Sequence, residues 1–176
     1  MSTLILMVGI EGSGRTKFAE ENLAVEGYVL VSTNKIVENL TKNSHQKAKV
    51  SSTVLGLADE EASIQVTNNL LSGKNVIWDD VHLTTADRRK HIGLARNYGA
   101  NNIVCYWMNL PYSRCAANIA NKLVPTGKSP KEMGVNLLSL TMEVADRANA
   151  LEQPSIKEGF DNLFEISEET YGQIEE

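Results

Sequence analysis

Short apolar runs alternate with longer amphipathic stretches along this chain. The runs with the length and composition of buried strands are Leu4–Val8, Tyr28–Val31, Asn75–Trp78, Ile103–Met108 and, more weakly, Leu163–Ile166. The stretches between them have the pattern of helices, over residues 15–22, 34–41, 53–72, 84–98, 111–122 and 130–148. Strands that alternate with helices form a parallel sheet with helices on both faces, because each parallel connection must cross over the sheet. The pattern therefore predicts an α/β fold.

Residues that start and stop helices mark several of these boundaries. Gly73 and Gly99 stand where helices should end before strands, a common place for glycine. Thr84 and Asp87 have the spacing of a capping box, in which a hydroxyl and an acidic side chain each satisfy a backbone N–H. Residues 129–132 (SPKE) have the same spacing, with proline at the first helical position. These signals predict helix starts near residues 85 and 130.

Two polar stretches interrupt the alternation. Residues 41–52 contain three lysines and are expected to form a mobile loop, and residues 123–131 (LVPTGKSPK) form a connection between two helices. Neither resembles a linker between domains, and no internal repeat is present. We therefore expect a single domain over residues 1–176, with a small helical lid at about 111–148.

Composition narrows the class of protein. The 176 residues are 42% hydrophobic, enough for a core, and the apolar run Leu4–Val8 is far shorter than a membrane span. No basic segment precedes that run, and Cys105 and Cys115 are too few for a disulfide framework. A reduced, cytoplasmic protein is expected.

The net charge of −5 is concentrated near the end of the sequence. Five of the 22 acidic residues fall in an acidic tail over 165–176, and the remaining 17 balance the 17 Lys and Arg. A neutral body with an acidic tail argues against a protein that coats long nucleic acid, since such binding depends on phosphate neutralisation. Short nucleic-acid ends and small phosphorylated substrates stay open, as does a homo-oligomer. No membrane partner is expected.

The first apolar run leads directly into a glycine-rich segment, residues 9–16 (GIEGSGRT), which precedes a helix. Its spacing is that of a phosphate-binding loop (P-loop), G-x-x-x-x-G-K-[ST], in which backbone N–H groups surround phosphate oxygens at a helix N-terminus. Thr16 can place its hydroxyl on Mg²⁺. Arg15 replaces the usual lysine, and its planar fork is not equivalent to a compact ammonium. The alternative, a glycine-rich turn that only closes a βα unit, fits this context less well.

Several further segments match one family in the same order along the chain. Residues 75–89 (NVIWDDVHLTTADRR) resemble a family strand that ends in Asp, followed by Thr-Asn and a helix that carries Arg. Residues 98–118 and the stretch Pro154–Asp161, with its Pro-x-x-x-Glu-Gly-Phe-Asp pattern, also match. Over nearly its whole length, the chain resembles the P-loop kinases of the polynucleotide 5′-hydroxyl kinase type.

This resemblance implies a P-loop kinase-like fold and transfer of the γ-phosphoryl group of ATP to a hydroxyl acceptor, with Mg²⁺ as the cofactor. The residues that would bind the nucleotide phosphates are Gly9, Gly12, Ser13, Gly14, Arg15 and Thr16. Asp80 would act in the active site or on the acceptor side, and either Asp79 or Asp80 could support Mg²⁺ through water. Arg88 would also belong to the acceptor or lid side.

The sequence departs from the family pattern at catalytic positions. Asn34 stands at the position of the general base, and Val37 replaces an acceptor-side Arg. In the lid, Ala117 and Asn121 replace two arginines. A general base contributes about 10²–10⁴ in rate, and a transition-state arginine about 10³–10⁵. Without substitutes for these groups, the protein would be a poor kinase.

Substitutes are available nearby in the sequence. The base could be Asp79, Asp80 or His82, which stands where the family has Asn, and the lid cation could be Lys122, Lys128 or Arg114. Asn118 is retained from the lid pattern. Three functions therefore stay open: a kinase for a nucleic-acid 5′ end or nucleotide, a small-molecule or nucleoside monophosphate kinase, and a pseudokinase that serves as a nucleotide-binding or interaction module.

The remaining aromatic residues and histidines have plainer interpretations. Trp78 and Trp107 lie in or beside strands and are expected in the core, while His45 and His91 are expected to be solvated. His82 is equally consistent with a phosphate contact and with a turn residue. The histidines lack the spacing of a structural zinc site.

Overall fold

The computed structural model describes residues 2–24, 27–42, 51–124, 128–129, 131–134 and 136–170. In this part of the chain, five strands form one parallel sheet in the order β2-β3-β1-β4-β5. The strands are β1 (Ser2–Val8), β2 (Val29–Ser32), β3 (Val76–Asp79), β4 (Ala100–Asn109) and β5 (Asn162–Ser167). The predicted fold, a P-loop kinase-like parallel sheet with helices on both faces, is confirmed.

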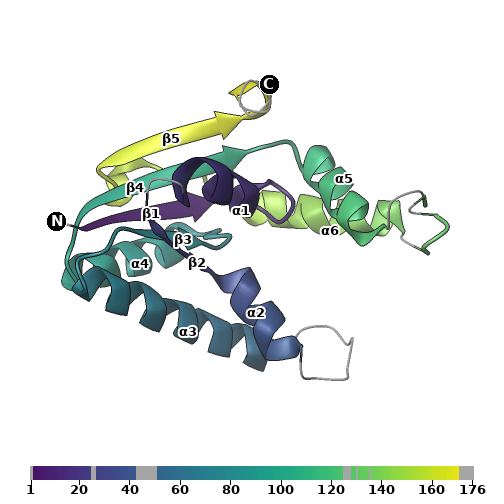
Figure 1. Cartoon of the computed structure of the whole chain (residues 1–176). Helices are drawn as coiled ribbons and strands as arrows, with labels where there is room; N and C mark the ends of the chain where they lie inside the picture. The colour runs from purple at the N-terminus through teal and green to yellow at the C-terminus, as the bar shows by residue number, and fades with distance from the viewer. Residues whose placement is uncertain are drawn as a thin grey trace.

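Two helical layers cover the sheet, because alternate side chains of each strand point to opposite faces (Figure 1). Leu6 and Trp78 point to the face that packs against α3 (Ser52–Leu71) and α4 (Thr85–Asn97). Met7 and Ile77 point to the opposite face, which is covered by a second group of helices. These are α1 (Arg15–Phe18), the π-helical turn η1 (Ala19–Leu23), α5 (Tyr112–Leu123) and α6 (Leu137–Ala150).

The predicted strands and most predicted helices agree with the structure. Trp78 and Trp107 are buried in the core, as expected. Thr84 caps α4, since its side chain accepts a hydrogen bond from the backbone N–H of Asp87 at 3.1 Å. Glu165, at the start of the expected acidic tail, lies in β5, and residues 171–176 lie outside the described residues.

One predicted helix start is wrong. Ser129 and Glu132 form the expected reciprocal contacts, from Ser129 N to Glu132 Oε2 at 2.6 Å and from Glu132 N to Ser129 Oγ at 3.4 Å. They close a turn rather than a helix, because Gly134 adopts a left-handed φ of 71° that a helix cannot continue through. Helix α6 begins only at Leu137, capped by Asn136.

The two predicted polar stretches flank described helices. Helix α2 (Thr33–Thr41) ends where the first stretch begins, and α3 begins at Ser52. Parts of both stretches lie outside the described residues: 43–50 in the expected loop, and 125–127 and 130 in the connection. Among the helices described, none combines the length and apolar character needed to cross a lipid bilayer.

Candidate phosphate-binding site

The segment Gly9–Thr16 connects β1 to α1 as a tight loop. Gly12 and Gly14 have φ angles of 81° and 83°, in the left-handed region that favours glycine. Gly12 is also required by packing, because a Cβ atom there would lie 2.3 Å from the carbonyl oxygen of Cys115. The glycine pattern of the sequence therefore gives the loop its path and lets α5 approach it closely.

Contacts from two other elements fix the loop. The backbone N–H of Gly9 donates to the carbonyl of Val81, after β3, at 3.2 Å. The side chain of Asn118, on α5, donates to the carbonyl of Gly12 at 2.9 Å. Asn118, expected on the lid side, thus holds α5 against the phosphate loop.

The carboxylate of Asp79 lies beside this loop, at the end of β3, and is fully buried. Its Oδ2 accepts hydrogen bonds from Thr16 Oγ1 at 2.6 Å and from Ser32 Oγ at 2.9 Å. The three residues meet because β2, β3 and β1 are neighbours in the sheet and end at the same edge. Nη1 of Arg15 lies 3.9 Å from Asp79 Oδ1, so the cation of the loop faces the same carboxylate.

Three buried polar atoms of this site have no hydrogen-bond partner among the described residues: Ser13 Oγ, Arg15 Nη1 and Asp79 Oδ1. Such atoms are rare in folded proteins, because each costs about 1–3 kcal/mol unless a ligand or water satisfies it. A guanidinium and a hydroxyl can bind phosphate oxygens, and a hydroxyl beside a carboxylate provides the oxygen donors that Mg²⁺ prefers. The donor set therefore fits a magnesium–phosphate group, with Thr16 and Asp79 as the residues that would hold the metal.

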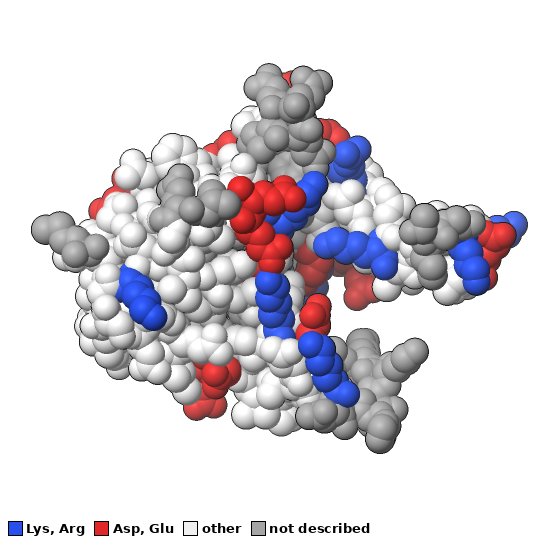
Figure 2. All heavy atoms as spheres, viewed as in Figure 1, with Lys and Arg blue, Asp and Glu red and all other residues white. Residues whose placement is uncertain are grey.

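Two hollows open beside the loop. The larger, of about 220 Å³, is lined by Gly12, Ser13, Gly14, Lys17, Leu110, Arg114, Asn118, Asn121 and Lys122. The smaller, of about 90 Å³, lies over the loop itself and is also lined by Glu11, Asn34 and Lys122. Figure 2 shows Lys and Arg side chains gathered along the hollowed region between the α5–α6 arm and the end of α2. Three cationic residues, Lys17, Arg114 and Lys122, give this region the charge that attracts a polyphosphate.

The structure separates the two adjacent aspartates that the sequence suggests. Asp79 faces the phosphate loop, whereas Asp80 accepts a hydrogen bond from the N–H of Val81 at 2.6 Å and lines a different cavity. Consecutive residues at a strand end point to opposite faces, which explains the separation. Among the other suggested residues, Asn34 and Lys122 lie at the loop, as described above.

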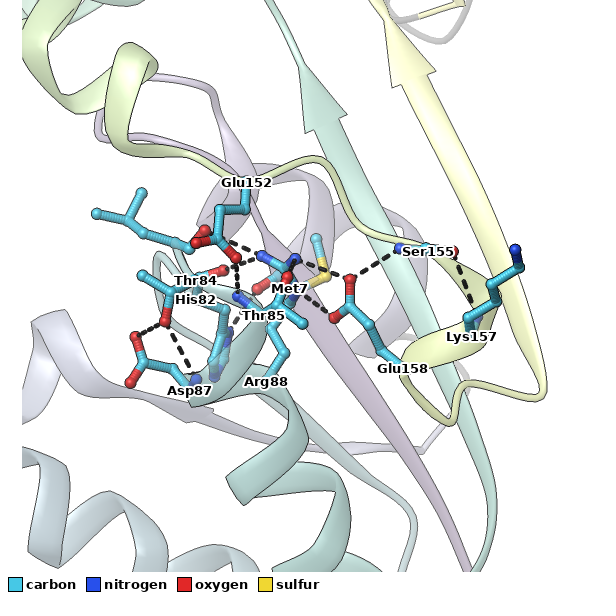
Figure 3. Close-up of polar contacts among 11 residues, drawn as sticks. Met7, His82, Thr84, Thr85, Asp87, Arg88, Glu152, Ser155, Lys157 and Glu158 are labelled. Atoms are coloured by element: carbon cyan, nitrogen blue, oxygen red, sulfur yellow. Dashed lines mark hydrogen bonds and ion pairs between the residues drawn. The ribbon is translucent and has the colours of Figure 1, made fainter.

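Arg88 lies in a buried ion pair instead of facing a substrate (Figure 3). Its Nε and Nη2 donate to the Glu158 carboxylate at 2.6 and 2.9 Å. Its other N–H groups donate to the carbonyls of His82 and Leu83 and to the hydroxyl of Thr85. All five donors of the guanidinium are therefore occupied, and its placement gives no support to a role on the acceptor side.

The histidines of this region are buried. His82, with φ of 46°, is only 2% exposed, and its Nδ1 lies 2.7 Å from the carbonyl oxygen of Met7. This contact agrees with a turn residue, and burial lowers its pKa. The expectation that His91 is solvated is wrong: its ring packs against Trp78, with centroids 4.1 Å apart, on the side of α4 that faces the sheet. Burial lowers the pKa of His91 to about 3.

Sequence reasoning missed two residues of the site, Ser32 and Glu11, and noted Asn121 only as a departure from the lid pattern. Ser32 ends β2 and donates to Asp79, and Glu11 and Asn121 line the hollows. A polar residue at the carboxyl end of a parallel strand is a usable signal for such a position, because the strand ends meet at one edge of the sheet. No comparable signal marks Glu11, which is a variable position in the loop pattern.

This geometry is that of a P-loop kinase-like domain, and comparisons with known proteins agree. A family model described as an AAA domain matches residues 4–138, so the chain belongs to that family. A comparison with curated protein sequences gives no significant match.

Solved structures with the same fold include several kinases. A candidate kinase from Chloroflexus aurantiacus j-10-fl has a TM-score of 0.72 at 14% identity, over 98% of this chain and 87% of that chain. A gluconokinase from Sinorhizobium meliloti 1021 has a TM-score of 0.58 at 18% identity, over 94% and 82%. A chain of the Pnkp1/Rnl/Hen1 RNA repair complex has a TM-score of 0.60 at 20% identity, over 81% of this chain and 45% of that chain. At these identities the likeness establishes the fold alone.

Proposed function

We propose that this protein is an ATP-dependent phosphotransferase of the polynucleotide 5′-hydroxyl kinase type. The γ-phosphoryl group of ATP passes to a hydroxyl of a nucleic-acid end or a nucleotide, which yields ADP, a phosphate ester and a proton. The observation that carries the proposal is a group of buried atoms at the phosphate loop that have no hydrogen-bond partner among the described residues: Ser13 Oγ, Arg15 Nη1 and Asp79 Oδ1. This group lies beside the contact between Thr16 and Asp79.

The residues of the site divide this work among them. The backbone of Gly9–Gly14 and the guanidinium of Arg15 bind and orient the phosphates. Bound Mg²⁺ would neutralise the phosphate charge during transfer, with Thr16 and Asp79 as its holders. Asn34 lies at the smaller hollow, where its carboxamide can orient an acceptor hydroxyl by hydrogen bonding but cannot take its proton. Lys122, which lines both hollows, is the lid cation best placed to approach the transferred group.

The first test separates binding from chemistry. The protein is titrated calorimetrically with ATP and a non-hydrolysable analogue, with and without Mg²⁺, and saturable binding that Mg²⁺ strengthens is expected. Transfer from γ-labelled ATP is then measured to 5′-hydroxyl DNA and RNA oligonucleotides, nucleoside monophosphates and gluconate. The proposal predicts label on oligonucleotides or nucleotides. Label on gluconate alone identifies a small-molecule kinase, and the absence of ATP binding contradicts the proposal as a whole.

A second candidate function is a pseudokinase that binds nucleotide without transferring phosphate. It is favoured by the carboxamide of Asn34 at the smaller hollow, where Glu11 is the carboxylate that lines it among the described residues. If this candidate is correct, wild-type protein binds ATP but labels no acceptor. The variant with Arg15→Lys, Asn34→Asp, Ala117→Arg and Asn121→Arg then gains transfer activity that the parent lacks. Robust wild-type transfer that Asp79→Asn abolishes contradicts the pseudokinase.

A further inference from the structure

A separate cavity, of about 240 Å³, lies on the other side of β3 from the phosphate loop and its two hollows. Its wall comes from the loop after β3, from α3 and from the first turns of α4: Asp59, Asp80, Val81, His82, Leu83, Asp87, Lys90 and His91. At roughly 30 Å³ per water molecule, this volume corresponds to several waters or one small ligand. None of the residues that line the phosphate-loop hollows is shared with it.

Two buried imidazole rings line this cavity and have unsatisfied nitrogen atoms. His82 and His91 are 2% and 5% exposed, and their rings meet edge to face with centroids 5.1 Å apart. Within the described residues, no hydrogen-bond partner is found for His82 Nε2 or for either ring nitrogen of His91. Several unpaired buried polar atoms at one cavity are costly unless a bound molecule satisfies them. This cluster is therefore unlike an ordinary core contact.

The chemistry of the wall specifies what it can bind. A carbonyl oxygen can only accept, so the short contact from His82 Nδ1 to Met7 O places the proton on Nδ1. His82 Nε2 is then an acceptor in the neutral ring, and burial lowers the pKa of both histidines, which keeps them neutral. The carboxylates of the wall, Asp59, Asp80 and Asp87, are acceptors as well. Neutral His91 has one N–H donor and one acceptor nitrogen, and its Nε2 lies 3.9 Å from Asp59 Oδ1. The acceptors of the wall still outnumber its donors, which favours a ligand rich in donors.

The charged residues of the wall also favour a ligand that donates hydrogen bonds and carries positive charge. Three aspartates face one lysine, Lys90, whose Nζ lies 3.6 Å from Asp59 Oδ2. The nearby guanidinium of Arg88 is neutralised by Glu158 and has no donor left. The wall therefore has a net negative charge, which repels phosphate esters and attracts cations.

From these observations we infer that this cavity, which we call the His82–His91 cavity, binds a small organic ligand that carries an ammonium group and hydroxyl groups. The ammonium lies against the carboxylates. Ammonium or hydroxyl protons donate to His82 Nε2 and to the acceptor nitrogen of His91, and a ligand hydroxyl oxygen accepts from the N–H of His91. The inference does not depend on phosphate transfer, because the cavity is lined by a separate set of residues. The backbone still connects the two sites, since Val81, between Asp80 and His82, accepts the hydrogen bond from Gly9.

The test uses three six-carbon polyhydroxy probes of different charge: the pyranoses glucosamine and glucose, and the open-chain gluconate. Side-chain ¹⁵N resonances of His82 and His91 are followed by NMR at pH 7 in the full-length protein, after assignment with His82→Asn and His91→Gln variants. Glucosamine is expected to shift both rings saturably, with glucose at least about tenfold weaker, the loss of one charge-assisted contact. Gluconate is expected to leave the rings unmoved.

Matched variants assign the binding to this wall. Asp80→Asn and Asp59→Asn each keep the side-chain shape and remove one charge, and each is expected to weaken glucosamine binding about tenfold. Asp146→Asn, on the exposed surface of α6, serves as the control and is expected to change nothing. Chemical unfolding confirms that each variant is folded.

Three outcomes overturn the inference. Rings that do not respond to glucosamine show that the cavity does not bind such a ligand. Equal responses to glucosamine and gluconate show that charge does not select the ligand. A response to Zn²⁺ alone, without one to glucosamine, shows that the histidines are metal ligands instead.

Discussion

The phosphate loop and the Arg88–Glu158 ion pair both place a buried arginine beside a buried carboxylate, but the two arginines differ in how many of their donors have hydrogen-bond partners. All five donors of Arg88 are satisfied by acceptors within the protein (Figure 3). Arg15 lies 3.9 Å from Asp79, and its Nη1 is without a hydrogen-bond partner in the described part of the chain. A satisfied cluster stabilises the fold, whereas an unsatisfied one is prepared for a ligand.

The comparison predicts that Arg88→Ala causes the largest loss of stability. The variant leaves the carboxylate of Glu158, which is 8% exposed, without its cation and leaves the carbonyls of His82 and Leu83 unpaired. Breaking a buried pair in this way costs about 3–5 kcal/mol. Urea unfolding measures the loss. A change below about 1 kcal/mol, the range of exposed pairs, would show that the cluster is not structural.

A second prediction concerns pH and the buried histidines. The pKa of His91 is lowered from an ordinary 6.5 to about 3 in the folded protein, so the unfolded chain binds the additional proton between these values. The contribution of this group to stability is therefore fully present above pH 6.5 and is lost as the pH decreases toward 3. One such group contributes at most about 1.4 kcal/mol per pH unit.

Unfolding of wild type and of His91→Gln over this pH range tests the effect. The variant is expected to lose less stability on acidification, because one titrating group is gone. Identical slopes for the two proteins would contradict the assigned burial. Asp146→Asn, on the surface of α6, provides a matched control for a change of polar side chain away from the cluster.

Local signals explain what the sequence predicts well. The phosphate loop is defined by glycines that need left-handed angles, and the strands by short apolar runs, so both are encoded within a few residues. The predicted start of α6 is wrong because Gly134 interrupts a capping pattern that is otherwise complete. Here the capping pattern favours a helix start and the glycine favours a turn, and only the structure shows which of the two signals prevails.

Long-range contacts explain what the sequence could not predict. The burial of Arg88 depends on Glu158, 70 residues away, and His91 is buried because its side of α4 turns toward Trp78. In the sequence, Arg88 and His91 in the first turns of a helix cannot be distinguished from solvent-facing residues until the sheet beneath that helix is placed. The separation of Asp79 from Asp80 likewise depends on where β3 ends.

The third prediction addresses the unsatisfied arginine. Arg15→Ala is expected to weaken Mg²⁺-dependent ATP binding about 10- to 100-fold, because a charge-assisted contact to phosphate is worth about 1.5–3 kcal/mol. Its free energy of unfolding should fall by less than that of Arg88→Ala, because the variant loses one 3.9 Å ion pair with Asp79, and Nη1 has no hydrogen bond in the described chain to break.

Calorimetry and urea unfolding measure the two effects on the same samples. Arg15→Lys is the conservative control, and its compact ammonium is expected to restore most of the affinity. If Arg15→Ala instead loses as much stability as Arg88→Ala and keeps its affinity for ATP, Arg15 is structural, and the contrast with Arg88 disappears.

The smallest effect is expected at a third arginine–carboxylate pair, which lies at the surface. Arg96 Nη2 donates to Asp161 Oδ2 at 2.6 Å, with side chains that are 35% and 41% exposed. Solvent screens this pair, so Arg96→Ala should cost less than about 1 kcal/mol, and less still at high salt.

Asp161→Ala should cost more, because its carboxylate also accepts from the backbone N–H of Ile103 at 2.6 Å. Urea unfolding at low and high salt measures both. Equal losses would show that the contact with Ile103 is worth no more than the hydrogen bond from Arg96 Nη1 to the carbonyl of Asn101 at 2.8 Å, which Arg96→Ala removes. The loss of stability is therefore expected to be largest for the buried and satisfied Arg88 and smallest for the exposed Arg96, whereas the buried and unsatisfied Arg15 acts chiefly on ligand binding.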